Sequence, residues 1–281
     1  MSIQGGAEVD ITDDSGSTAL SWAARKGHDE IVNLLIETGQ VDMNTKDLAL
    51  ADPLSYAAEF GHDAIVQLLL ETNKVDVDSK DSAGSTPLSQ AAENGFETVV
   101  ELLLETGQVD VDSKDFSGRT PLSRAAENGF EAVVEVLIET GQVDVNSKDP
   151  GGRTPLSWAA ENGFETVVEL LLETGQVDVD SKDFSGRTPL SRAAENGFDT
   201  VVEALIETGQ VEVDSNDSDA ATPLSWASRN GHDRVVKLLL ETRQVEVDSK
   251  DSIGWTPLFR AMLNGHDLVK DVLLAVGQHR D

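Results

Sequence analysis

Histidine and aspartate are the side chains of this chain best suited to acid–base or metal chemistry. Four of the five histidines occupy one repeated position, directly after a glycine: His28, His62, His232 and His266. Other copies of that position hold phenylalanine: Phe96, Phe130, Phe164 and Phe198. Neighbouring copies would lie about 10 Å apart, too far for two histidines to share a metal. We therefore predict a structural residue joining two helices.

Aspartate triplets suggest calcium binding as a second kind of chemistry. The triplet Asp110, Asp112 and Asp115 recurs as Asp76, Asp78, Asp81 and as Asp178, Asp180, Asp183. An EF-hand loop also needs a ligand at its fifth position and an early glycine. Here Lys114 takes the fifth position and Gly118 comes late. We predict solvated loops with no metal site and no cofactor, although weak, nonspecific divalent binding stays open.

Composition and motifs exclude several function classes. The chain has no cysteine, which excludes disulfides, thiolate metal sites and a cysteine nucleophile. It contains no phosphate-binding loop, zinc-protease helix or nucleophile elbow, so we predict no catalytic residue. With 52 acidic and 21 basic residues the net charge is −31, which argues against nucleic acid and anionic membranes as partners.

The sequence also indicates where the protein works. No apolar stretch approaches the roughly 20 residues of a membrane span. The start, MSIQGGAEVD, lacks the basic and apolar regions of a signal peptide. We expect a soluble, monomeric, cytoplasmic protein, with the nucleus as an alternative location.

A repeated unit positions all these residues. The pattern D-x-x-G-x-T-P-L recurs every 34 residues, beginning at Asp13, Asp47, Asp81, Asp115, Asp149, Asp183, Asp217 and Asp251. A fixed period in this range is typical of a stacked array. We predict eight repeats over residues 13–281, and interpret residues 1–12 as the remnant of a preceding repeat or an N-terminal cap.

Each copy predicts two short helices. In the third copy Thr86 can cap the first helix, Pro87 suits its first turn and Gly95 can end it. The second helix is predicted over about 97–106 and is apolar around most of its circumference, so neighbouring copies must stack to bury it. Its glutamate stripe predicts a solvated face, with a basic partner as the alternative. The tail GQVDVDSKD predicts an extended arm and a tight turn.

These units resemble the ankyrin repeat family. The resemblance rests on D-x-x-G-x-T-P-L, then A-A-x-x-G-H or G-F, then V-V-x-x-L-L and a Val-Asp-Val tail, from Asp13 to about Gly277. It implies an all-α solenoid of helix-turn-helix repeats joined by β-turn or hairpin loops. Ser89 and its equivalents replace the family's usual histidine, and the period is one residue longer than usual. The units also resemble arrays of large fungal multidomain proteins, some of them similar to innate immune receptors.

One position of the first helix carries side chains that are typical of binding hot spots. From copy to copy it holds Trp22, Tyr56, Gln90, Arg124, Trp158, Arg192, Trp226 and Arg260. It lies about 200° around the helix from the apolar leucine, so we predict that it is exposed. Candidate contacts in the turns are Phe116, Arg119, Arg153, Phe184, Arg187 and Trp255. The resemblance implies that turn tips and first helices line a concave groove.

The arginines of these positions form a basic strip on an acidic chain. The functional interpretation is a groove that binds an acidic or aromatic-bearing segment of a partner protein. The alternative pairs each arginine with a nearby glutamate, such as Glu127, Glu161 or Glu195, on an ordinary solvated surface. From another class, an enzyme or enzyme-associated array would use the groove as an active site. A spacer without a partner is a third possibility.

Overall fold

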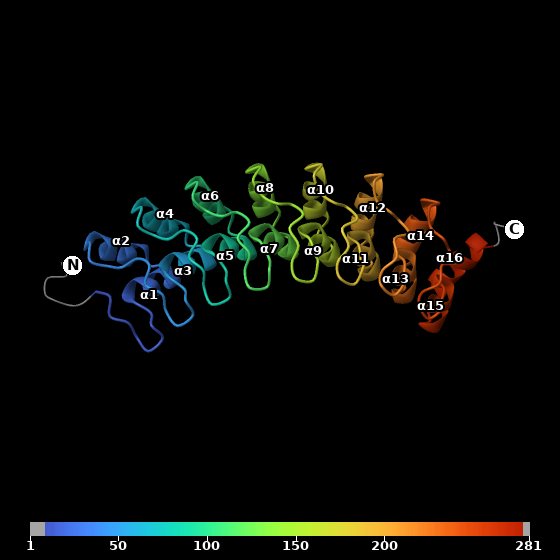
Figure 1. The fold of residues 1–281 in the computed structure, drawn as a ribbon, viewed down its shortest axis with the longest axis horizontal. Coiled ribbons are helices and arrows are strands. Elements are labelled where there is room, and N and C mark those ends of the chain that lie inside the picture. The colour runs from blue at the N-terminus through green and yellow to red at the C-terminus, as the bar shows by residue number, and fades with distance from the viewer. Residues whose placement is uncertain (1–8, 278–281) are drawn as a thin grey trace. The chain divides into compact units, whose positions relative to one another are not determined.

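The computed structural model describes residues 9–277, and in that part of the chain it contains sixteen helices and no strand (Figure 1). The helices are α1 (Ala19–Lys26), α2 (Asp29–Glu37), α3 (Pro53–Glu59), α4 (Asp63–Glu71), α5 (Pro87–Asn94), α6 (Glu97–Glu105), α7 (Pro121–Asn128), α8 (Glu131–Glu139), α9 (Pro155–Asn162), α10 (Glu165–Glu173), α11 (Pro189–Asn196), α12 (Asp199–Glu207), α13 (Pro223–Asn230), α14 (Asp233–Glu241), α15 (Pro257–Leu263) and α16 (Asp267–Gly277). The predicted fold class, an all-α stack of helix-turn-helix repeats, is confirmed. None of the described helices is both long and apolar enough to span a membrane.

Local capping explains where the first helices begin and end. The Thr86 hydroxyl oxygen accepts a hydrogen bond from the Ser89 amide at 3.2 Å, and Pro87 occupies the first turn. Gly95 ends α5 with φ of 76°, a conformation that suits glycine. In the irregular second copy Asp52 replaces the threonine and accepts from the Ser55 amide at 2.8 Å. The helix boundaries predicted from these residues are confirmed.

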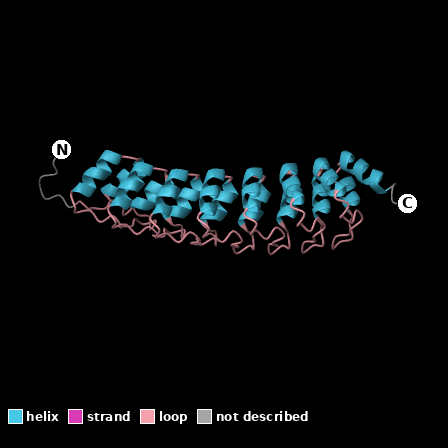
Figure 2. Ribbon diagram, turned by 90° about the horizontal axis from the view of Figure 1, so that it is seen from above, coloured by secondary structure: helices cyan, strands magenta, loops and turns pink. Residues whose placement is uncertain are grey.

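The chain divides into two compact units, residues 9–125 with 135–143 and residues 126–134 with 144–277. In the first unit α1, α3 and α5 pack in one row and α2, α4 and α6 in a second. In the second unit α9, α11, α13 and α15 form one row, and α10, α12, α14 and α16 the other. Within each unit the loops gather along one edge of the helices (Figure 2).

The core lies between the helix rows of each unit. In the third repeat Leu88, Ala91 and Ala92 of α5 are fully buried, as are Val100 and Leu103 of α6. The two alanines let neighbouring first helices approach closely, whereas each buried leucine or valine contributes roughly 1.5–3 kcal/mol. One repeat alone cannot cover this surface, so stability comes from stacking.

Single backbone-to-backbone hydrogen bonds, not strand ladders, join the turn tips of neighbouring repeats. The Phe116 amide donates to the Ala83 carbonyl at 2.9 Å, and the Phe184 amide to the Gly151 carbonyl at 2.9 Å. One bond per tip is too few for the alternating pairs of a β-ladder. The predicted extended arm is therefore an irregular loop with turns in the described residues.

The start of the chain bears on the predicted remnant of a preceding repeat. Residues 1–8 of that segment lie outside the described residues. Asp10 accepts a hydrogen bond from the Asp42 amide at 3.0 Å. One repeat later Asn44 accepts from the Asp76 amide in the same way at 2.8 Å. Asp10 thus makes the contact that a repeat tail makes, while the repeat boundaries and the remnant stay predictions.

Candidate functional site

The hot-spot-like position of the first helix bonds to the aspartate that opens its own repeat. The Trp226 indole N–H donates to Asp217 Oδ2 at 2.9 Å, and the Gln90 amide to Asp81 Oδ2 at 2.9 Å. The same bond joins Trp22 to Asp13, Tyr56 to Asp47, Arg124 to Asp115, Arg192 to Asp183 and Arg260 to Asp251. The shared property of these side chains is an N–H or O–H donor that reaches back nine residues.

The burial of this position corrects the prediction that it is exposed. Tyr56, Gln90, Trp158 and Trp226 are only 7–8% exposed. The arginines at this position are partly buried, and only Trp22 keeps 41% of its surface exposed. The angle of about 200° around the helix predicts correctly where the Cα atom lies. The long side chains, however, bend back toward the turn that opens their own repeat. They are therefore first of all structural residues.

Some of these groups have shifted pKa values. Hydrogen bonds from the Ser15 hydroxyl and the Trp22 indole lower the pKa of Asp13 to about 2. Burial alone raises the pKa of Asp115, but hydrogen bonds from the Arg119 amide, Ser117 and Arg124, with the Arg124 charge, outweigh it and leave the pKa low. Burial, the hydrogen bond to Asp47 and its charge raise the pKa of Tyr56 to about 12. These aspartates thus stay ionised and the tyrosine neutral near neutral pH.

Two turn-tip phenylalanines are the most exposed predicted contacts. Phe116 is 77% exposed and Phe184 is 80% exposed. Each ring lies beside a glycine of the preceding repeat: a Cβ added to Gly84 would stand 2.7 Å from the Phe116 ring, and one on Gly152 would stand 3.1 Å from Phe184. Each ring therefore lies against the preceding repeat on one side and faces solvent on the other. Trp255 is partly buried in its turn and contacts Phe259, with ring centroids 5.2 Å apart.

The predicted basic strip has glutamate partners. Arg153 pairs with Glu161 at 2.9 Å, and Arg187 pairs with Glu195 at 2.5 Å. Each guanidinium also covers an indole, Arg153 on Trp158 at 4.2 Å and Arg187 on Trp226 at 4.1 Å. In the first-helix position Arg124 also contacts Glu93 at 3.3 Å and Arg192 contacts Glu161 at 3.6 Å. Arg119 is partly buried, and its amide donates to Asp115 at 3.0 Å. The glutamate-pairing alternative therefore describes Arg124, Arg153, Arg187 and Arg192.

The repeated histidines connect neighbouring repeats. His232 Nε2 lies 2.9 Å from the Glu195 carbonyl oxygen, and His266 Nε2 lies 3.0 Å from that of Arg229. The tail aspartates likewise bond to backbone: Asp78 accepts from the Asp110 amide at 2.9 Å. Burial raises the pKa of Asp78, with repulsion from Asp110 adding to it. In the described part of the chain no three His, Cys, Asp or Glu side chains are grouped to hold a metal.

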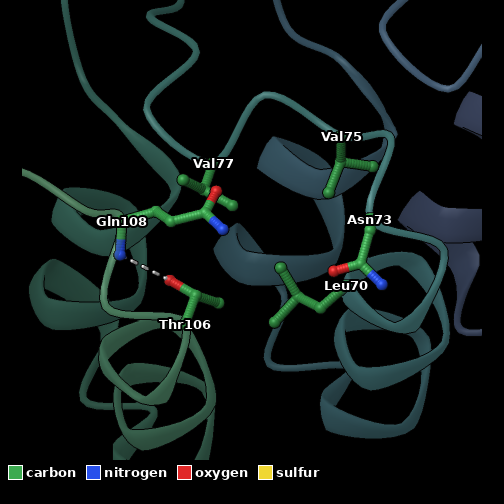
Figure 3. A pocket seen from close by; sticks show the side chains of 6 residues that line it. All are labelled: Leu70, Asn73, Val75, Val77, Thr106 and Gln108. Atoms are coloured by element: carbon green, nitrogen blue, oxygen red, sulfur yellow. Dashed lines mark hydrogen bonds between the residues drawn. The ribbon is translucent and has the colours of Figure 1, made fainter.

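A small pocket that the sequence did not predict lies at the ends of second helices in the first unit (Figure 3). It has a volume of about 130 Å³ and is lined by Leu70, Asn73, Val75, Val77, Thr106 and Gln108. The second unit has an equivalent of about 250 Å³, lined by Leu172, Gly175, Val177, Val179, Thr208 and Gln210. Aliphatic, hydroxyl and amide groups line both, so these side chains offer no general acid or base.

The sequence also missed an aromatic cluster in the first two repeats. The Arg25 guanidinium lies within 5.2–5.8 Å of the ring centroids of Trp22, Tyr56 and Phe60. A signal for it was present, because Phe60 stands where six later copies carry asparagine.

Comparison with known proteins agrees with this architecture. A family model described as ankyrin repeats (3 copies) matches residues 2–81, 54–149, 141–217 and 200–279. No curated protein sequence matches the chain significantly. Ankyrin repeats are generally protein-interaction modules and are typically non-catalytic. Together the matched residues span almost the whole sequence, and the chain belongs to the ankyrin repeat family.

Proposed function

We propose that this chain is a non-enzymatic protein-interaction module. In each unit the binding surface consists of turn tips and first helices. The observation that carries the proposal is the exposure of Phe116 and Phe184 on tips fixed by backbone hydrogen bonds. An exposed aromatic ring that is already fixed loses little conformational entropy when a partner covers it. Phenylalanine is among the aromatic residues that are enriched at protein–protein interfaces.

The ion pairs of the turn-tip arginines favour an apolar or aromatic partner segment over an acidic one. Arg153 and Arg187 already have glutamate partners, so an acidic segment would have to replace an existing ion pair. The buried indoles of Trp158 and Trp226 support these guanidinium groups from below. In this proposal the phenylalanines contact the partner directly, and the tryptophans hold the arginines in position.

Replacing both phenylalanines by serine tests the proposal. Ser82, Ser218 and Ser252 occupy the equivalent position in other repeats, so Phe116→Ser with Phe184→Ser should leave the fold intact. The matched control is Glu203→Gln on the exposed side of α12. In quantitative affinity capture we expect proteins retained by the wild type and by Glu203→Gln to be lost from the double variant. Equal retention by the double variant, with unchanged circular dichroism, would overturn the assignment.

A further inference from the structure

Three aromatic rings from two adjacent repeats surround one cation. The Arg25 guanidinium lies 5.6 Å from the Trp22 ring centroid, 5.2 Å from that of Tyr56 and 5.8 Å from that of Phe60. These distances are within the roughly 6 Å over which a ring face attracts a cation. Lys26 places its ammonium group 5.8 Å from the Trp22 ring as well. The aromatic rings of the first two repeats therefore already surround one guanidinium group, that of Arg25.

The rings are fixed more firmly than the cation that they surround. The Trp22 indole is tied to Asp13 by a hydrogen bond of 2.7 Å, and the Tyr56 hydroxyl donates to Asp47. Phe60 ends α3 and stacks near His62, with ring centroids 6.4 Å apart. Arg25, by contrast, is an exposed residue at the end of α1. The cluster is preorganised, and its occupant can leave by rotating into solvent.

The electrostatic surroundings favour a positive ligand. Asp13 and Asp47 each bond to one of the rings, and the partly buried carboxyl of Glu59 lies close enough to interact with the Arg25 charge. The whole chain carries a net charge of −31, which attracts cationic segments over long range. Phe60 and Trp22 are each 41% exposed, so both rings are reachable from solvent.

We propose that Trp22, Tyr56 and Phe60 form a subsite for one arginine side chain of the partner protein, in addition to the apolar or aromatic segment that the turn tips contact. The incoming guanidinium displaces Arg25, which occupies the subsite in the free chain. Guanidinium suits the site because it stacks on aromatic faces and is more weakly hydrated than ammonium. This inference rests on the proposed function, since it assigns one subsite of the same surface, but its test requires no partner.

Fluorine NMR of the full chain labelled with 5-fluorotryptophan provides the test. The four tryptophans give four resonances, assigned by replacing each with phenylalanine. The probe is N-acetyl-arginine amide, and its neutral analogue N-acetyl-citrulline amide is the matched control. We expect arginine to shift the Trp22 resonance saturably and citrulline to leave it unchanged. The Trp158 resonance is the internal reference, because that ring is buried and Arg153, which covers it, is held by Glu161.

Two variants make the test decisive. Arg25→Ala removes the resident guanidinium and keeps the backbone carbonyl that faces His62, so the probe should bind about two- to fivefold more tightly. Adding Phe60→Asn, the residue of six later repeats, should reverse that gain. A Trp22 resonance that does not respond, responds equally to citrulline, or reports the same affinity in Arg25→Ala as in the wild type would overturn the subsite. Such a failure would leave the phenylalanine-dependent capture unaffected.

Discussion

The ring of Phe198 lies directly against the backbone of Gly163 in the preceding repeat. A Cβ built on this glycine would stand 2.5 Å from a ring carbon, closer than any normal contact. Gly163 also has φ of 79°, a conformation that side chains disfavour. Two separate constraints, one local and one between repeats, therefore demand glycine here. Through this contact the helix pair of one repeat packs against that of the next.

Gly163→Ala should consequently destabilise the second unit by at least about 2 kcal/mol, from left-handed backbone strain and from displacement of the Phe198 ring. Gly175 provides the matched control, because it has φ of 65° with no atom within 4 Å of an added Cβ. Asn73 and Arg243 already occupy equivalent positions at φ of 55° and 56°, so Gly175→Asn should be nearly neutral. Urea denaturation followed by circular dichroism measures both. Equal unfolding midpoints for the two variants would contradict the close-contact argument.

The sequence predicted the helices well because their causes are local. Thr86, Pro87 and Gly95 act within one turn of the residues they cap, so their types suffice to place the ends of α5. The stacking of repeats was also predicted from the sequence, because the apolar surface of the second helix can be buried only against neighbouring repeats. The close contact between Gly163 and Phe198 did not follow, because it depends on how two repeats are positioned in space.

The candidate site was less predictable for the same physical reason. Burial of Trp226 depends on a bond to Asp217 nine residues away and on Arg187 of the preceding repeat. Tryptophan and arginine are typical of hot spots, but both are also long donors that satisfy a buried carboxylate. Residue type alone does not separate these roles. Phe116 and Phe184 were predicted as contacts, and their exposure is compatible with that role, which stays a prediction.

Arg192 allows the structural role to be measured. Its guanidinium is bonded to Asp183, whose side chain is only 3% exposed. Arg192→Met removes the donor and leaves a buried carboxylate, so we expect a loss of roughly 2–4 kcal/mol. Arg192→Gln keeps a donor of the kind that Gln90 supplies in the third repeat at 2.9 Å, and should lose clearly less. Thermal unfolding midpoints of both variants provide the comparison, and identical losses would exclude the hydrogen bond as the cause.

The pH dependence of stability should have a maximum in mild acid. One group of aspartates has lowered pKa values, because hydrogen bonds and arginine charges outweigh burial: Asp115, Asp183 and Asp251. Their folded-state pKa lies below the unfolded value, so their stabilisation is present above about pH 4 and is lost as the pH falls through the folded pKa. A second group has pKa values raised mainly by burial: Asp78, Asp180 and Asp214.

The second group acts in the opposite direction. Its ionised form is disfavoured in the folded chain, so protonation stabilises the fold as the pH falls through the raised pKa values. Relief of the net charge of −31 adds to this effect. Thermal midpoints measured between pH 3 and pH 8 should therefore rise from neutral to mildly acidic pH and fall below about pH 4. A midpoint that only decreases from pH 7 downward would contradict the assignment of the raised values.

One substitution at the irregular N-cap of α3, in the second repeat, should increase the stability of the protein. Asp52 is 1% exposed, and its Oδ2 has no hydrogen-bond partner among the described residues. At the equivalent place Thr154 bonds its hydroxyl to that of Ser157 at 3.1 Å. Asp52→Thr would restore this pair and remove a buried, half-satisfied carboxylate, so we expect a gain of about 1–2 kcal/mol. The reverse change, Thr154→Asp, should lose a similar amount.

Both cap variants keep an oxygen that can accept the amide bond at the helix start, so helix content by circular dichroism should not change. Only the urea midpoint should move, upward for Asp52→Thr and downward for Thr154→Asp. A drop in stability for Asp52→Thr would mean that the attraction between the aspartate charge and the N-terminus of α3 exceeds the desolvation penalty. In that case Asp52, the residue that departs from the repeat pattern, would itself stabilise the second repeat.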